Sequence, residues 1–137
     1  FQDGSFRPQE PVSRAQLIAI AMRFEDQIPD AVSPFPDVPD DYWAKDAIAY
    51  AVQQGWVNGY PEGTFLPEHP VTRAEAVKII NRLLERNPDD DYIKSQAFTL
   101  PFGDVNRTHW AYAEIAEAAV AHSYIREGET ETWTGIQ

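Results

Sequence analysis

The stretch "VTRAEAVKII" at residues 71–80 decides how this chain begins to fold. Within it, Thr72 is followed three positions later by Glu75, and apolar residues then recur at three- and four-residue spacing. The first pattern is a capping box, in which the threonine hydroxyl accepts a hydrogen bond from the first helical turn and the glutamate bonds back to the cap. The second pattern is typical of an amphipathic helix. Together they predict a helix over residues 72–86.

The same motif occurs a second time, as "VSRAQLIAIA" at residues 12–21. Ser13 and Gln16 take the places of the hydroxyl residue and its partner, so a second helix is expected over residues 13–26. The residues before this motif match those before the other one at a constant spacing, without a gap. A repeat of tens of residues determines the architecture of a chain. The matching pairs include Gly4 with Gly63, Phe6 with Phe65, Pro8 with Pro67, and Pro11 with Pro70.

An arginine follows the hydroxyl residue in both motifs, Arg73 in one and Arg14 in the other. A cation at this position faces the positive end of the helix dipole, which by itself costs from a few tenths to about 1 kcal/mol. Folding alone therefore favours an acidic residue here. Either each arginine pairs with a carboxylate or lies along an aromatic ring, or it binds an anionic ligand with help from the helix N-terminus.

A second pair of segments also matches, "FPDVPDDYWAKDAIAYA" and "FGDVNRTHWAYAEIAEA". Asp41 and Thr108 are good N-caps, so each is expected to begin a helix, the second of them over residues 110–121. Gly55 is expected to end the first of these helices in a left-handed conformation. The proline- and glycine-rich loop at residues 57–70 then predicts fixed turns rather than a helix or a strand.

These matches divide the chain into three repeats of one helix-loop-helix unit, within a single domain over residues 1–137. The second repeat, residues 35–86, is complete, whereas residues 1–26 and 102–137 hold parts of the first and third repeats. The fold class predicted from this pattern is all-α, a bundle of repeated helix-loop-helix units. The partial repeats could be completed by each other, by a second chain or by further sequence.

The bulk composition excludes several classes of partner. There are 22 acidic and 11 basic residues, with a formal net charge of -11, so binding to nucleic acid is not expected. No apolar run reaches the length of about 18 residues that a membrane helix needs, and no signal pattern is visible. We expect a soluble piece without membrane insertion, with any export signal outside it. Cysteine is absent, which excludes thiolate metal sites and cysteine nucleophiles.

The sequence shows no catalytic, metal-binding or cofactor motif. His69, His109 and His122 form no ligand pattern such as H-E-x-x-H, and neither a nucleophile elbow nor a phosphate loop occurs. The acidic run at residues 89–91 lacks the spacing of a calcium loop and is expected to be solvated charge. We therefore expect no enzyme, no metal and no cofactor. A glycan-acting enzyme is the weakest alternative, because plentiful carboxylates do not by themselves make a site.

Taken together, "FPDV", "YWAKDAIAYAVQQGWVNGYPEGTFLPEHP" and "VTRAEAVKIINRLL" resemble the S-layer homology domain, which attaches bacterial surface proteins to the cell wall. The resemblance covers one full motif over residues 35–84 and partial motifs on both sides. In this family, three such modules usually form a pseudo-threefold arrangement of helices whose grooves bind a secondary cell-wall polysaccharide, commonly one with pyruvate ketals. The resemblance implies noncovalent anchoring outside the cell, at the bacterial cell surface and wall.

The resemblance also implies ligand-binding residues. Arg73 and Arg14 occupy the arginine of the family's Thr-Arg-Ala-Glu motif, where a guanidinium can bind the carboxylate of a pyruvyl ketal through a charge-assisted, bidentate contact. Gly59 and Tyr60 occupy the family's loop, and Phe1 stands where Tyr60 would be in the first repeat. A wall polysaccharide is therefore the expected partner.

Two tryptophans and the third repeat leave alternatives open. Trp43 and Trp110 either offer flat faces to a sugar ring or anchor the core at the start of a helix. The third repeat has His122 and Glu127 near the positions of the glycines of the second repeat, so its groove is expected to be incomplete. The alternative function is a protein-protein interaction or self-assembly module that joins other surface-layer subunits and does not bind the wall polymer.

Overall fold

The structure is a computed structural model that describes residue 4 and residues 6–25, 27–95 and 99–137. Phe1, predicted to stand where Tyr60 would be, lies outside these residues. None of the helices in the described ranges is both long and apolar enough to cross a membrane.

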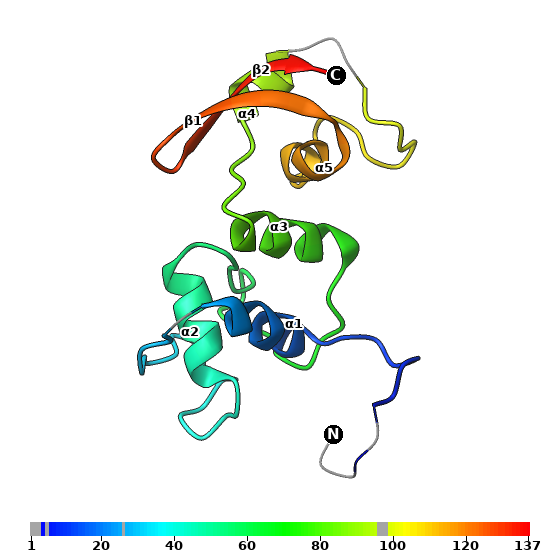
Figure 1. Cartoon of the computed structure of the whole chain (residues 1–137). Coiled ribbons are helices and arrows are strands. Elements are labelled where there is room, and N and C mark those ends of the chain that lie inside the picture. The colour runs from blue at the N-terminus through cyan, green and yellow to red at the C-terminus, as the bar shows by residue number, and fades with distance from the viewer. Residues whose placement is uncertain (1–3, 5, 26, 96–98) are drawn as a thin grey trace. The chain divides into compact units, whose positions relative to one another are not determined.

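The N-terminal unit, one of two compact units in the chain, consists of Phe1–Gln53 and Asn58–Val71. It contains helix α1 (Arg14–Ala21), the short 3-10 helix η1 (Met22–Phe24) and helix α2 (Lys45–Gln53). Helices α1 and α2 contact each other (Figure 1), and small and branched apolar residues are buried on both. The buried residues are Ala15, Ile18, Ala21 and Met22 from the first segment, and Ala47, Ile48, Ala49 and Ala51 from α2.

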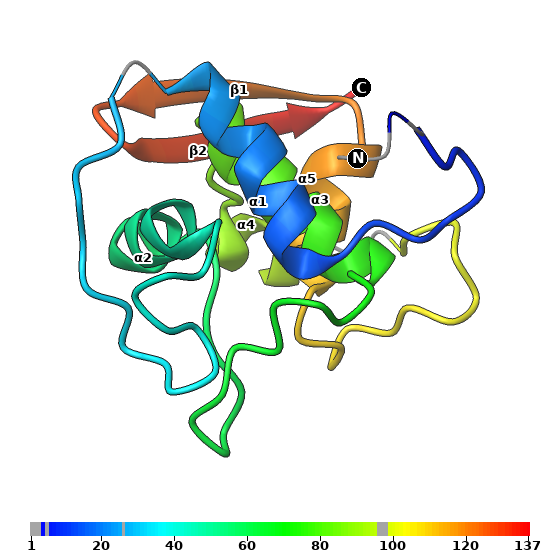
Figure 2. The same cartoon turned by 90° about the horizontal axis from the view of Figure 1, so that it is seen from below.

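The C-terminal unit consists of Gln54–Val57 and Thr72–Gln137. Helix α5 contacts both α3 and α4, and the two strands pair as an antiparallel hairpin. In Figure 1 the hairpin arches over α5, and Figure 2 shows its two strands side by side. The elements of this unit are α3 (Arg73–Leu83), α4 (Asp90–Ser95), α5 (Tyr112–Ala119), β1 (His122–Glu127) and β2 (Thr130–Ile136).

Both predicted capping boxes are confirmed. Ser13 Oγ accepts from the backbone N–H of Gln16 at 3.3 Å, and Ser13 N donates to Gln16 Oε1 at 3.0 Å. Thr72 and Glu75 make the same two bonds at 3.3 and 2.9 Å. The starts of α1 and α3 are therefore determined locally, by side chains three residues apart.

The two capped helices end earlier than expected. Helix α1 stops at Ala21 and tightens into η1, whose last residue is followed by Glu25 in an extended conformation. Helix α3 stops at Leu83, because Glu85 adopts a left-handed φ of 55°. The left-handed conformation expected at Gly55 is confirmed by its φ of 70°.

The predicted all-α fold is wrong, because residues 122–136 form a β-hairpin. The stretch "HSYIREGETETWTGI" alternates exposed and buried positions along β2, and threonine, tyrosine and isoleucine favour strands. Its two-residue turn begins with Gly128 at a φ of 62°, the residue and conformation that tight hairpin turns favour. The fold is mixed, with helices in both units and one two-stranded sheet in the C-terminal unit.

The helix starts expected at Asp41 and Thr108 are also wrong. Helix α2 begins only at Lys45, after a turn in which Lys45 N donates to Tyr42 O at 3.0 Å. Helix α5 begins at Tyr112 without a side-chain cap. The hydroxyl of Thr108 is already used, since it donates to Asn106 Oδ1 at 2.6 Å.

The core of the C-terminal unit joins α5 to α4 and to the hairpin. Tyr112 and Ala116 of α5 are buried, and Trp133 of β2 packs with them at 2% exposure. Asp89 links the start of α4 to β2, because one carboxylate oxygen accepts from Tyr92 N at 2.9 Å and the other from Trp133 N at 3.0 Å. The remaining buried members of this core are Ile93, Leu100 and Ala113.

Candidate functional site

Arg73 stands exposed at the N-terminus of α3. Its guanidinium has no hydrogen-bond or ion-pair partner among the described residues, and the same holds for the backbone N–H groups of Arg73 and Ala74. The capping box uses the N–H groups of Thr72 and Glu75, on either side of these two. This helix start therefore presents a guanidinium and two backbone donors, which together favour an anion.

A pocket of about 580 Å³ lies beside this helix start, within the C-terminal unit. The N-cap residue Thr72 lines it together with Arg73 and Val77 of α3, and Ile115 lines it from α5. This volume falls within the range of about 300–1,000 Å³ that ligand sites occupy. The pocket can therefore hold a small polar group together with an apolar face.

Two polar residues that line this pocket were not predicted as site residues. Asp104 and His109 come from the segment before α5, alongside the half-exposed ring of Phe102. A carboxylate and an imidazole can hydrogen-bond sugar hydroxyls. The only sequence signal for Asp104 is its match with Asp37 in the repeat, and His109 carries no such signal.

Arg14 lies in a very different environment, although it occupies the same position of its motif. The side chain is buried, with the residue 4% exposed, and its guanidinium donates to Phe65 O at 3.1 Å and to Asn58 O at 2.9 Å. The guanidinium carbon lies 4.8 Å from the centre of the Tyr60 ring and 4.6 Å from that of Phe65. The structure thus brings Arg14 and Tyr60 together, in a cage formed by the loop.

Gly59 belongs to the same loop and packs closely against Phe35. A Cβ atom added at Gly59 would lie 2.2 Å from Phe35 Cε1 and 3.0 Å from Thr64 O. Phe35 in turn packs on Phe65, with ring centroids 5.2 Å apart. Only glycine lets this loop approach the ring so closely, so Gly59 supports the cage around Arg14.

Asp37 fixes the other side of the loop. Its carboxylate accepts from Phe65 N at 2.9 Å and from Leu66 N at 2.7 Å. These two bonds hold the backbone of the loop while Phe65 O accepts from Arg14. The loop at residues 57–70 is a set of fixed turns, as the sequence predicts.

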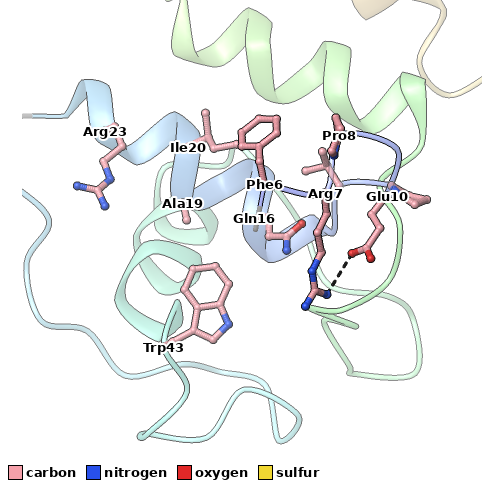
Figure 3. A pocket seen from close by; sticks show the side chains of 11 residues that line it. Phe6, Arg7, Pro8, Glu10, Gln16, Ala19, Ile20, Arg23 and Trp43 are labelled. Carbon is pink, nitrogen blue, oxygen red and sulfur yellow. Dashed lines mark hydrogen bonds and ion pairs between the residues drawn. The ribbon is translucent and has the colours of Figure 1, made fainter. Parts of the chain in front are cut away.

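Trp43 is 61% exposed and lines a pocket of about 460 Å³ in the N-terminal unit (Figure 3). Its interpretation as a core anchor is wrong. Arg23 and Gln16 also line this pocket, and Figure 3 shows an Arg7–Glu10 ion pair at its far side. A flat ring near a cation and an amide can accept a sugar ring.

The ring of Tyr42 supports Trp43, with their centroids 5.8 Å apart. The Tyr42 hydroxyl donates to Glu68, which holds the tyrosine in place. Burial, together with this bond to a carboxylate, raises the pKa of Tyr42 above its ordinary value.

Trp110 is likewise 61% exposed, so its interpretation as a core anchor is also wrong. It stacks on His109, with centroids 5.9 Å apart and planes 28° apart. Because His109 lines the Arg73 pocket, Trp110 lies next to that pocket without lining it. In the described part of the C-terminal unit, Arg73 and Trp110 are thus placed near one pocket.

Comparison with known proteins identifies a family. Residues 1–18 and 34–77 match the S-layer homology domain. This match covers the capping box of the first motif and most of the complete repeat.

Similar proteins share longer stretches of this chain. Cell surface glycoprotein 1 of Acetivibrio thermocellus is 33% identical across 99% of the chain, which spans 6% of that protein. A cellulosome-anchoring protein of the same organism is 34% identical across 90% of the chain, which spans 28% of it. An S-layer protein of Bacillus licheniformis is 40% identical across 42% of the chain. The chain therefore spans under a third of the length of the first two relatives.

Proposed function

The chain belongs to the S-layer homology domain family and to a cell-surface protein, and on this premise we propose that it is a wall anchor. It binds an anionic polysaccharide of the bacterial cell wall noncovalently, and a pyruvylated polymer fits best. The chain acts as a binding module rather than as an enzyme. Its three repeats over residues 1–137 act as a single domain.

The start of α3 carries this proposal. Arg73 is exposed, and its guanidinium and the N–H groups of Arg73 and Ala74 have no partner in the described part of the chain. A pyruvyl ketal carries a carboxylate, which can accept two parallel bonds from a guanidinium. The helix dipole adds to the attraction. The unfavourable interaction between Arg73 and the helix dipole is thus offset when an anion binds.

The walls of the pocket suit the rest of a sugar. Val77 and Ile115 offer apolar contact to the C–H face of a ring, while Asp104 and His109 offer hydrogen bonds to its hydroxyl groups. The negative charge of Asp104 disfavours a polymer with anions on every position. We therefore expect a sugar with one acidic substituent directed to Arg73.

The remaining predicted residues supply a second contact in this proposal. Trp43 provides a stacking face, and Arg23 provides a cation in the same pocket. Arg14 stays a predicted anion contact together with Gly59 and Tyr60. Because two backbone carbonyls already accept from Arg14, it can contribute less to binding than Arg73.

The test is binding to purified wall polysaccharide, with and without removal of its acidic substituents. Arg73→Ala should lower the affinity for the intact polymer at least about tenfold, since a hydrogen bond between charged groups contributes more than 1.4 kcal/mol. The affinity of Arg73→Lys should lie between those of the parent and Arg73→Ala, because an ammonium group keeps the charge but cannot reproduce the planar fork of the guanidinium. Lys94→Ala is the matched control, since it removes a surface cation that lies outside the pocket.

The outcomes separate the candidate functions. Equal retention of the parent and Arg73→Ala contradicts the proposed anion contact. Equal retention of the polymer before and after removal of its acidic groups contradicts an anionic ligand. Shortening of the polymer during incubation indicates a glycan-acting enzyme.

A protein-interaction module is the second candidate function, in which the chain joins other surface subunits. It is favoured by large apolar side chains at the surface of the N-terminal unit, including Phe24 at 73% and Val32 at 84% exposure. Failure of the parent chain to bind the polymer, together with concentration-dependent self-association in sedimentation, favours this candidate over the wall anchor.

A further inference from the structure

Three ionisable side chains converge inside the C-terminal unit, away from the Arg73 pocket. Glu117 comes from α5, His122 begins β1, and Glu131 lies on β2. Their side chains are 0%, 1% and 0% exposed. One ligand atom from each lies within 4.8 Å of the other two. A buried cluster of this kind has to be neutralised, because isolated charges are costly in the interior.

Two carboxylate oxygens in the cluster accept no hydrogen bond. They are Glu117 Oε1 and Glu131 Oε1, both fully buried. His122 Nε2 lies 3.4 Å from the first and 3.5 Å from the second. Buried polar atoms are almost always satisfied. Arg86 offers Glu117 Oε1 an ion pair at 2.6 Å, so it is Glu131 Oε1 in particular that points to a partner that the chain itself does not supply.

The histidine is oriented as a metal ligand. His122 Nδ1 lies 2.7 Å from Val120 O, and a carbonyl can only accept, so the proton of the neutral ring is on Nδ1. The lone pair of Nε2 then faces the two carboxylate oxygens. The His122 ring also stacks on Trp133 at 3.7 Å, and Trp133 Nε1 donates to Glu117 Oε2 at 2.8 Å. A bond from the second ring nitrogen to a carbonyl is the usual support for a metal-binding histidine.

Two of the three spacings between these atoms fit a tetrahedral dication. Zinc bonds of about 2.0–2.2 Å place neighbouring tetrahedral ligands roughly 3.3–3.6 Å apart. The two distances from His122 Nε2, 3.4 and 3.5 Å, fall in that interval. We propose that Glu117, His122 and Glu131 form a binding site for a divalent transition metal of the zinc type, which fastens the hairpin to α5.

Two arginines balance the charge of this cluster without the metal. Arg126 Nη2 lies 3.1 Å from Glu131 Oε2, and the bond to this carboxylate raises the pKa of Arg126. Arg86 Nη2 lies 2.6 Å from Glu117 Oε1 and 3.4 Å from His122 Nε2. The Arg86 side chain is 31% exposed, so it can turn to water when a metal takes that oxygen. Arg86 and the metal therefore compete for Glu117.

Sequence patterns do not reveal this site. The three residues lie on three elements, and only His122 was considered as a ligand, without partners at a regular spacing. The hairpin creates the site, because its register places Glu131 opposite Arg126 and on the same face as Trp133.

The experiment titrates the full chain with zinc chloride, using calorimetry and thermal unfolding, with magnesium chloride as the comparison ion. We expect one zinc per chain and a rise in Tm that magnesium does not produce. Glu131→Gln should weaken zinc binding at least about tenfold, whereas Glu127→Gln, on the exposed part of β1, should leave it unchanged. Cobalt(II) added to the parent should give the visible absorption of a tetrahedral site.

Arg86→Gln provides a second test that does not depend on the folding of the Glu131 variant. If Arg86 competes with the metal, this variant should bind zinc severalfold more tightly than the parent. Absence of zinc binding in both the parent and Arg86→Gln overturns the proposal and leaves the cluster as an ion-pair network. Equal zinc affinity in the parent and a folded Glu131→Gln chain also overturns it.

Discussion

The starts of α1 and α3 carry the same motif in opposite environments. In α1 the first two N–H groups are satisfied by the loop, since Arg14 N donates to His69 O at 2.9 Å and Ala15 N to Pro67 O at 3.0 Å. In α3 the corresponding N–H groups have no partner among the described residues. Arg14 is 4% exposed, whereas Arg73 is exposed. The motif thus determines where a helix starts, and its surroundings determine what its arginine does.

The difference between the two starts comes from the segment that could cover each one. In the N-terminal unit, the turns of residues 57–70 close over Arg14, held by Asp37 and Phe65. In the C-terminal unit, the segment that matches this loop in the repeat is the β-hairpin, and none of its residues lines the Arg73 pocket. The hairpin packs on α5 instead, through Trp133. The loop therefore covers the arginine of one copy, whereas the arginine of the other copy is exposed beside a pocket.

The largest expected effect is that of Arg14→Ala. This change removes a buried cation from between two rings and leaves Phe65 O and Asn58 O without their donor. We expect a loss of about 3 kcal/mol in the free energy of unfolding. Urea unfolding measures it. A loss below about 0.5 kcal/mol would mean that the cage does not depend on Arg14, and the distinction between the two copies would fail.

The next effect concerns the loop that closes over Arg14. Gly59→Ala places a methyl group 2.2 Å from Phe35 Cε1, so the ring or the loop must move. Overpacking of this kind costs about 1–3 kcal/mol. Gly103→Ala is the matched control, because a Cβ atom there meets nothing within 4 Å. Thermal unfolding of the two variants should separate them clearly, and equal Tm values would contradict the close approach.

Short-range features of this fold could be predicted from the sequence. The capping boxes depend on residues three positions apart, and the left-handed Gly55 depends on one residue. The exposure of Trp43 and the burial of Arg14 could not be predicted from residues close to them in the sequence. The partners of Arg14 lie 44 and 51 residues away in the chain, and no local pattern specifies them.

The hairpin was missed for another reason. The third repeat was expected to continue into a loop like that of the second repeat, although the alternating threonines at residues 130, 132 and 134, just after Gly128, indicate a strand. These residues form strands rather than turns, because Glu131 and Trp133 can be buried against α5 only if alternate residues share a face.

The polar residues of the Arg73 pocket, Asp104 and His109, were missed because tertiary packing brings them to α3.

A smaller effect tests whether the two caps are equivalent. Thr72→Ala and Ser13→Ala each remove the acceptor for the N–H group three residues later. Each should lower the free energy of unfolding by about 1 kcal/mol. The caps are local, so the two losses should agree within about 0.5 kcal/mol in the same urea measurement. A much larger loss for Ser13→Ala would show that the closed surroundings of α1 extend to its cap.

The smallest expected effect is a rise, rather than a fall, in the free energy of unfolding. Arg73 faces the positive end of the α3 dipole and has no partner among the described residues, so it contributes nothing to the folded chain that would offset this repulsion. Arg73→Ala should therefore raise the free energy of unfolding by a few tenths of a kcal/mol at low salt, and the gain should fade as salt screens the dipole. Urea unfolding at two salt concentrations measures both. If Arg73→Ala lowered the free energy of unfolding nearly as much as Arg14→Ala, Arg73 would be a structural residue. A small rise in the free energy of unfolding together with weaker polymer binding is the result expected of an arginine that serves a ligand.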